Sequence, residues 1–191
     1  MQDDNLQDKI KRDFLETAKL LSQLAETESK KIMKAGDMIV EAFRSGRKIL
    51  ACGNGGSAAD AQHFTAEFIG RFYAERQSLP AITLSSDPSV VTAIGNDYGF
   101  ASVFARQIEG LGNPGDILVV ISTSGKSANI LEAIDAAKRK NMKIIALVGG
   151  YVDEKVSGCD LYFSVLSNTP RIQEAHIVIL HSICESVEEH I

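Results

Sequence analysis

Residues 117–148 read ILVVISTSGKSANILEAIDAAKRKNMKIIALV. The segment begins and ends with short apolar runs rich in β-branched residues, 117–121 and 144–148, and such runs are typical of buried strands. Between them, residues 128–140 carry apolar side chains at helical spacing. A strand, a helix and a second strand in this order predict a βαβ unit, in which the two strands are parallel.

Three further apolar runs of the same kind, 49–52, 81–84 and 161–165, lie on either side of this unit. No Pro-rich or Ser-rich linker divides the chain, and no internal repeat is present. We therefore expect one α/β domain, a doubly wound and mainly parallel sheet of five strands flanked by helices. The last predicted helix begins near Pro170 and is apolar on more than one face. It therefore packs either inside the monomer or between chains, and the pattern leaves both interpretations open.

The N-terminal region, residues 1–46, is expected to form helices that precede the α/β core of residues 47–191. Its apolar residues recur at intervals of three, four and seven positions, the spacing of an amphipathic helix: Leu6, Ile10, Phe14, Leu21 and Leu24. A second helix is predicted from about Lys30 to Arg44, and Gly46 is expected to end it. This helix pair is expected to pack on the sheet or on another subunit.

Composition narrows the class of protein. A chain of 191 residues is about one domain, and 45% hydrophobic with 24% charged residues is typical of a globular protein rather than a disordered or fibrous one. No apolar run approaches the ~18 residues of a membrane span, and the charged N-terminus differs from a signal peptide, so we expect a cytoplasmic protein. The net charge of −5 disfavours nucleic acid as a partner. The three cysteines have no CxxC spacing, which disfavours disulfides and thiolate zinc sites.

Two predicted strands end in loops rich in glycine and hydroxyl groups, GNGGS at 53–57 and STSGKS at 122–127. Both loops lead into helices, whose N-termini attract anions. The spacings of GxGxxG and Walker A motifs are absent, which disfavours NAD and ATP. Either loop alone is explained as an ordinary capped turn. Two of them at the carboxyl ends of parallel strands favour a phosphate site.

Histidines supply the candidate chemistry. His63 and Glu67 lie four residues apart on the helix after GNGGS, so they share a face, either as an ordinary surface pair or as part of a site. In the final helix, Gln173, His176 and His181 lie among apolar residues, where a histidine is also explained as a core residue. Gln173 and His181 are ~12 Å apart along the helix axis. One small ligand hardly reaches both, so we hypothesise either a distorted helix start or a site between subunits.

Four segments together resemble one known family: CGNGGSAADAQHFTAEFIGRF at 52–72, GNDYGF at 95–100, ISTSGKSANI at 121–130 and RIQEAHIVILH at 171–181. The chain resembles the phosphoheptose isomerase family of the sugar isomerase (SIS) domain superfamily over essentially its whole length. The resemblance implies a single SIS-type domain and an aldose–ketose isomerase that converts D-sedoheptulose 7-phosphate to D-glycero-D-manno-heptose 7-phosphate. This reaction is the first step towards ADP-heptose for lipopolysaccharide or capsule. The resemblance also implies a homotetramer with its sites at subunit interfaces.

The same resemblance assigns residues. Glu67 matches the catalytic base and His181 its acid partner. One zinc ion per subunit is implied, with His63, Glu67, Gln173 and His181 as ligands, and no nucleotide cofactor. The implied substrate contacts are Asn54, Gly55, Gly56, Ser57, Glu67, Asn96, Asp97, Ser122, Thr123, Ser124, Ser127 and Gln173. Some relatives carry an acidic residue where this chain has Pro170, so any proton-handling role at that position is vacant in this chain.

The chemistry agrees with these roles. Isomerisation needs one group that moves a proton between C1 and C2 and a second that manages the proton on O1 or O2 through a cis-enediol. A glutamate bound tightly to zinc is a poorer base, so the role of the metal stays open. Two alternatives remain: a non-catalytic SIS module of the replication-initiator-associating type that binds a sugar phosphate or a protein, and an enzyme for a different sugar phosphate. The retained His63, Glu67, Gln173 and His181 favour an enzyme.

Overall fold

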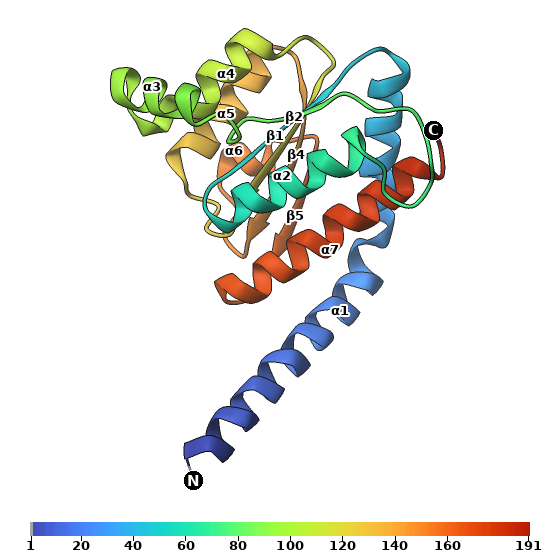
Figure 1. Ribbon diagram of the computed structural model, residues 1–191, viewed down its shortest axis with the longest axis vertical. Coiled ribbons are helices and arrows are strands. Elements are labelled where there is room, and N and C mark those ends of the chain that lie inside the picture. The colour runs from blue at the N-terminus through green and yellow to red at the C-terminus, as the bar shows by residue number, and fades with distance from the viewer. Residues whose placement is uncertain (1) are drawn as a thin grey trace.

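The protein is built around one parallel sheet. The computed structural model describes residues 2–191, with the side chains of residues 5–191. The sheet has five strands in the order β2-β1-β3-β4-β5 (Figure 1). Their bounds are β1 Ile49–Gly53, β2 Ala81–Thr83, β3 Ile117–Ser122, β4 Lys143–Gly149 and β5 Leu161–Val165. Each predicted apolar run forms one of these strands, and all four neighbouring pairs are parallel, so the predicted sheet is confirmed.

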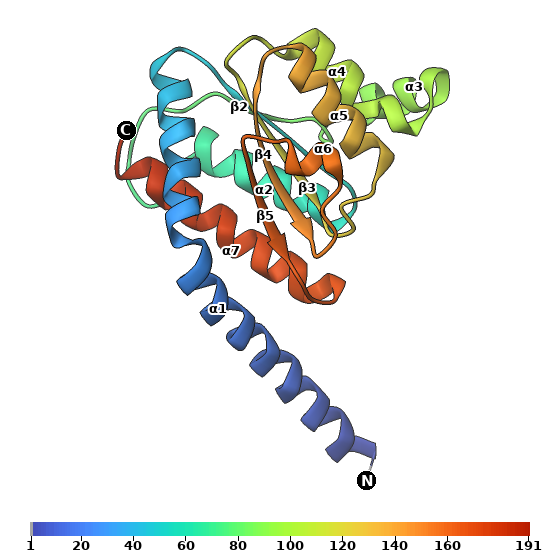
Figure 2. The ribbon, with the colours of Figure 1, turned by 180° about the vertical axis from the view of Figure 1, so that it is seen from behind.

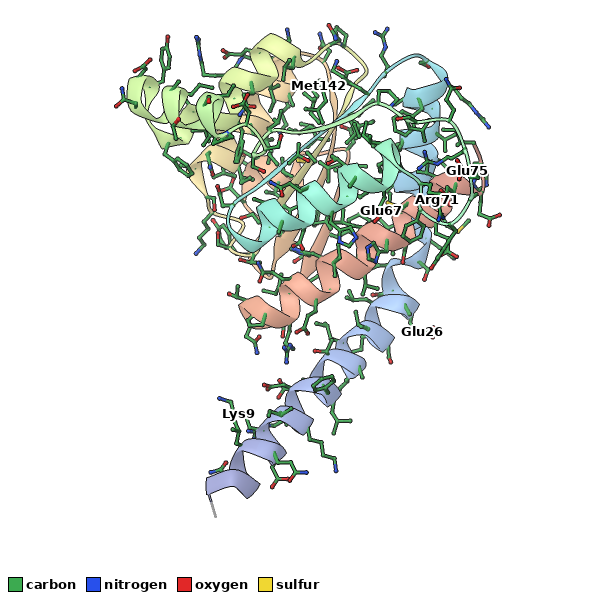
Figure 3. All side chains as sticks on the ribbon, in the orientation of Figure 1. Lys9, Glu26, Glu67, Arg71, Glu75 and Met142 are labelled. Carbon is green, nitrogen blue, oxygen red and sulfur yellow. The ribbon has the colours of Figure 1, made fainter. Side chains whose placement is uncertain are left out.

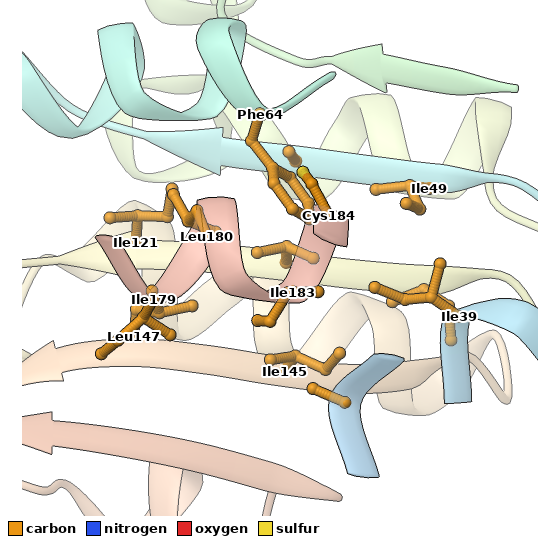
Figure 4. Packing of buried hydrophobic residues seen from close by; sticks show 14 of the residues in the cluster. Ile39, Ile49, Phe64, Ile121, Ile145, Leu147, Ile179, Leu180, Ile183 and Cys184 are labelled. Atoms are coloured by element: carbon orange, nitrogen blue, oxygen red, sulfur yellow. The ribbon is translucent and has the colours of Figure 1, made fainter. Parts of the chain in front are cut away.

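Helices cover both faces of the sheet because successive strand residues point to opposite sides. On one face, Ile49 and Ala51 pack with α1 (Gln2–Arg44), α2 (Gly56–Ile69) and α7 (Thr169–Glu188). Figure 4 shows part of this core, with Phe64 of α2 and Cys184 of α7 among the side chains that cover the strands. On the other face, Leu50 and Cys52 pack with α4 (Val103–Leu111), α5 (Ala128–Arg139) and α6 (Glu154–Ser157).

The N-terminal region is one helix, so the prediction of a helix pair is wrong. Helix α1 continues without a break through residues 24–30, which contain neither glycine nor proline to stop it. The hydroxyls of Thr27 and Ser29 there donate to carbonyls one turn earlier and leave the helix intact. Gly46, with φ +69°, follows the end of α1 as predicted. Figure 2 shows the first half of α1 extending away from the sheet.

The final helix begins beside Pro170 as predicted, with Asn168 capping its first turn. Its buried residues pack against the sheet, α1 and α2, so packing inside the monomer accounts for most of its apolar surface. His176 is one of the buried residues, and its Nε2 donates to the carbonyl of Val148 at 3.2 Å. Within residues 2–191, none of the helices carries an apolar stretch of membrane-spanning length.

Candidate active site

The two glycine and hydroxyl loops lie side by side. They follow β1 and β3, which pair in register from Ile49 opposite Ile117 to Gly53 opposite Ile121. From β1 the chain continues to β2 at one edge of the sheet, whereas from β3 it continues to β4 on the other side. In this strand order the β1/β3 position is the switch point, where open α/β sheets bind ligands. The structure therefore brings the predicted phosphate loops to the expected place.

The loop after β3 gathers three hydroxyl groups. The Oγ atoms of Ser122, Ser124 and Ser127 are separated by 3.4, 3.5 and 3.4 Å. Hydroxyl hydrogen bonds are usually ~2.7–2.8 Å long, so these groups converge without bonding one another tightly. Gly125 turns the loop with φ +64°, and a Cβ there would lie 2.4 Å from the carbonyl oxygen of Tyr151. Only glycine fits this turn. The turn brings the three hydroxyl groups close to one another.

The helices that start at these loops are not capped by their own side chains. In α2 and α5 the N-cap residues, Gly55 and Ser127, make no side-chain cap hydrogen bond. In α3 (Pro88–Tyr98), α6 and α7, by contrast, Asp87, Asp153 and Asn168 accept hydrogen bonds from first-turn amides, whereas α4, away from these loops, also has no side-chain cap. Because first-turn N–H groups need an acceptor, the uncapped ends of α2 and α5 suit an anionic ligand.

An amide pair that sequence reasoning missed joins the two loops. Asn54 and Asn129 exchange two hydrogen bonds of 2.9 Å, each donating from Nδ2 to the Oδ1 of the other. Asn129 is buried, so these bonds satisfy polar atoms that water does not reach. The local signal for Asn129 is weak, because an asparagine in the first turn of a helix is ordinary. The pair fixes the spacing between the two loops.

Helices α2 and α7 run side by side in the same direction, in contact along their length (Figures 1 and 2). At their beginnings, Gln173 lies against Gly56, where an added Cβ would be 2.1 Å from Gln173 Nε2. About two turns further along, His63 of α2 meets His181 of α7, with 3.3 Å between their Nε2 atoms. The helix pair therefore places the Gln173 amide beside the loops and a second polar group, the two histidines, away from them.

The second contact is a group of three side chains. His63 Nε2 lies 2.9 Å from Glu67 Oε1 and also faces His181 Nε2. In a neutral imidazole, His63 Nε2 either carries a proton, which it donates to one partner, or has a lone pair, which accepts a proton from one partner. The contacts of this nitrogen with Glu67 and with His181 therefore compete. Burial lowers the pKa of His181 below its ordinary value; a charge on His63 lowers it further, and Glu67 opposes both. In Figure 3, Glu67 lies between α2 and α7.

The same three residues suit a metal ion. One ligand atom each from His63, Glu67 and His181 lie within 4.8 Å of one another. Two imidazole nitrogens and a carboxylate oxygen are common ligands of transition metals, and a cation between them would satisfy all three lone pairs at once. The competing contacts around His63 Nε2 support this fit.

Comparison with known proteins agrees with this geometry. A profile of the SIS domain family matches residues 14–149. A phosphoheptose isomerase from Methylibium petroleiphilum is 48% identical over 187 residues, which cover 96% of this chain and 94% of that protein. The chain belongs to the phosphoheptose isomerase family. Among solved structures, phosphoheptose isomerase GmhA from Neisseria gonorrhoeae matches with a TM-score of 0.89 and 41% identity, covering 96% of this chain and 99% of that one. A phosphoheptose isomerase from Francisella tularensis matches with a TM-score of 0.91 and 40% identity, covering 95% and 97%.

Within one chain, the site residues that the family resemblance implies form two groups, and one pair of residues lies apart from both. The first group lies around the switch point and consists of Asn54, Gly55, Gly56, Ser57, Gln173 and the Ser122–Ser127 loop, including Thr123. His63, Glu67 and His181 form the second group. Asn96 and Asp97 are exposed on α3, which packs against α4 and the short helix η1 (Phe100–Ser102). The assignment of Gln173 as a fourth metal ligand stays a prediction.

Two other residues near the second group were not identified by the sequence analysis. Asp60 lies one turn before His63; burial raises its pKa, and the charge of His63 opposes this. One of its carboxyl oxygens is buried without a partner among the described residues. The ring of Phe72, beyond the end of α2, lies 5.5 Å from the ring of His181. The SAADAQH stretch offered a signal for Asp60, whereas the contact of Phe72 depends on tertiary structure alone.

Proposed function

We propose that this protein converts D-sedoheptulose 7-phosphate to D-glycero-D-manno-heptose 7-phosphate by proton transfer through a cis-enediol. The observation that carries the proposal is the arrangement along α2 and α7, with uncapped, hydroxyl-lined turns at one end and Glu67 beside His181 further along. The names of the relatives, phosphoheptose isomerase, support the same substrate class. We place the enzyme in the cytoplasm, at the first step towards ADP-heptose for lipopolysaccharide or capsule.

Each step uses residues of this chain. The Ser122–Ser127 loop and the amides that begin α2 and α5 bind the phosphate and hold the sugar in place. Glu67 removes a proton from C1 of the ketose and returns it to C2. His181 supplies the proton that O2 needs and takes the proton that O1 loses, so the carbonyl moves from C2 to C1. The overall change is an intramolecular oxidation and reduction that requires no redox cofactor.

A zinc ion, one per subunit, belongs to the same proposal. His63, Glu67 and His181 would hold it, with Gln173 as the fourth ligand that the family resemblance implies. When bound, zinc supplies Lewis-acid polarisation of the sugar oxygens. Because coordination makes Glu67 a poorer base, the test of the activity includes a chelator arm.

A homotetramer is also proposed, with its sites near subunit interfaces. Helix α1 carries exposed apolar side chains, including Phe14 at 75% and Leu15 at 61% of full exposure. A groove of about 560 Å³ runs between α1 and α7, and Leu24, Met33 and Val178 are among its apolar lining residues. Contiguous apolar surface of this kind suits a second copy of the chain. Light scattering is expected to give four times the chain mass, and a monomer for F14E.

The test of the activity is incubation with sedoheptulose 7-phosphate, with and without a chelator, with the product followed by NMR. We expect heptose 7-phosphate in at least the untreated sample. Formation of product in both samples would assign the metal a role other than the proton transfers. No heptose 7-phosphate under either condition would contradict the proposed activity and favour a binding module.

A further inference from the structure

The last turn of α7 is tied to the loop that follows α2. The Glu188 carboxylate accepts hydrogen bonds from three successive backbone amides, those of Phe72 at 2.9 Å, Tyr73 at 2.8 Å and Ala74 at 3.0 Å. Arg76 Nε donates to the same carboxylate at 3.2 Å. The side chains of Glu188 and Arg76 are only 7% and 11% exposed. We call this arrangement, Glu188 with Arg76 and the amides of 72–74, the Glu188 clamp.

The clamp reaches back to the end of α2. The guanidinium of Arg76 donates from Nη2 to the carbonyl oxygen of Glu67 at 2.6 Å and from Nη1 to that of Phe68 at 2.9 Å. The last carbonyls of a helix lack partners within the helix, so the guanidinium supplies what α2 itself cannot. The backbone of Glu67 is therefore held directly by the clamp.

The clamp also reaches His181. Glu188 lies seven residues after His181, two turns along the same face of α7. Phe72, whose amide is held by Glu188, places its ring 5.5 Å from the ring of His181. One carboxylate thus connects the backbone of Glu67, through Arg76, with the surroundings of the His181 imidazole, through Phe72.

The clamp is more elaborate than a helix end requires. A carboxylate in the last turn of a helix faces the negative end of the helix dipole, which is unfavourable. Burial raises the pKa of Glu188, yet the three amides and Arg76 outweigh burial and lower it below the ordinary value, so the carboxylate stays charged. The structure thus holds a mostly buried charge at the unfavourable end of the helix dipole.

We propose that Glu188 and Arg76 are positioning residues of the isomerase, which set the separation and angle between the Glu67 carboxylate and the His181 imidazole. They act through these two residues and touch no substrate. The inference rests on the proposed function, since it assigns the clamp to the proton-transfer pair. Removing the clamp is therefore expected to lower the rate of the chemical step more than the binding of the sugar phosphate.

The test compares E188Q, R76K and a matched control, E75Q, with the wild-type chain on sedoheptulose 7-phosphate. Glu75 lies in the same loop with its side chain 91% exposed and pairs at 3.7 Å with Arg71, so E75Q removes the same charge without removing a contact of Glu188 or Arg76. We expect kcat to fall at least ~10-fold in E188Q and R76K with KM within ~2-fold, because small displacements of reacting groups reduce rates strongly. Hydrogen exchange of the amides of 72–74 is expected to accelerate in E188Q only.

Two results would overturn the inference. In one, kcat stays within twofold of wild type in both clamp variants; in the other, KM rises as much as kcat falls. R76K decides by the same criteria if E188Q does not fold, because it keeps the charge and loses the forked contacts. A wild-type chain without isomerase activity would instead contradict the proposed function, and this role with it.

Discussion

The two ends of the α2–α7 pair differ in chemistry. At the beginnings of the helices, the groups around the switch point are hydroxyls, side-chain amides and backbone N–H, with the Asn54–Asn129 pair holding them, while the ammonium of Lys126 lies over the Tyr151 ring. Further along, the group of His63, Glu67 and His181 consists entirely of residues that titrate. Neutral donors at a helix start bind an anion without bringing a competing charge to the site. Under the proposed function, phosphate binding and proton transfer are kept apart along one pair of helices.

The largest expected effect comes from the titrating end. Glu67→Gln removes proton abstraction and keeps volume, so kcat is expected to fall at least ~10³-fold with KM close to wild type. Steady-state kinetics on sedoheptulose 7-phosphate measure both values, and E109Q, an exposed acid on α4, serves as the control. Turnover like that of wild type in Glu67→Gln would overturn the base assignment and the division between the two ends.

A second prediction concerns His176, which lies between Gln173 and His181 in sequence but belongs to neither end of the helix pair. We expect it to affect stability. Burial lowers the pKa of His176 to about 4 from 6.5, and the bond to Val148 only partly opposes this. Between these pH values the unfolded chain binds a proton that the folded chain does not, so stability falls as pH falls. The loss approaches ~3 kcal/mol at pH 4.

Urea unfolding at a series of pH values measures this loss. The free energy of unfolding is expected to decrease less between pH 6.5 and 4 in H176Q than in wild type, by about the same ~3 kcal/mol. H190Q, at the exposed end of the chain, is the control and is expected to follow wild type. Equal decreases in H176Q and wild type would show that His176 does not carry the effect.

The phosphate end is probed by Ser124→Ala. Loss of one hydroxyl bond to a charged ligand is expected to raise KM ~10-fold with kcat nearly unchanged. Ser157→Ala is the matched control, because Ser157 is exposed and its hydroxyl bonds, among the residues that the structure describes, only to the carbonyl of Glu154. A fall in kcat with KM unchanged in Ser124→Ala would mean that the loop acts on the chemistry rather than on binding.

The smallest expected effect concerns the link between the two loops. A double-mutant cycle with N54A and N129A is expected to give a coupling free energy of unfolding of ~1 kcal/mol, because each substitution alone already breaks both amide bonds. Strict additivity of the two single variants would show that the pair does not hold the loops together.

Much of this arrangement could be predicted from sequence where the signals are local. The β-branched runs predict the strands, and the loops after 49–52 and 117–121 predict the switch-point site. The spacing of His63 and Glu67 predicts their shared face. The break predicted in α1 was wrong, because alternating polar and apolar residues without glycine or proline do not end a helix.

The remaining features depend on contacts between distant parts of the chain. Asn54 contacts Asn129, which lies 75 residues further along the sequence. Glu188 contacts the amides of 72–74, which lie more than 110 residues before it. Neither contact leaves a pattern of spacing, because Asn129 and Glu188 are ordinary residues for their helices and their partners lie in loops. His181 was assigned through family resemblance, and only the fold brings it beside His63.

The most direct test of proton transfer at Glu67 is isomerisation of sedoheptulose 7-phosphate in D₂O, with C2 of the product observed by NMR. A proton carried by a carboxylate exchanges with solvent, so deuterium is expected to accumulate at C2 over repeated turnovers of the wild-type chain and not with Glu67→Gln. Retention of protium at C2 together with turnover like that of wild type in Glu67→Gln would mean a direct hydride shift, and would contradict the roles of Glu67 as base and His181 as its acid partner.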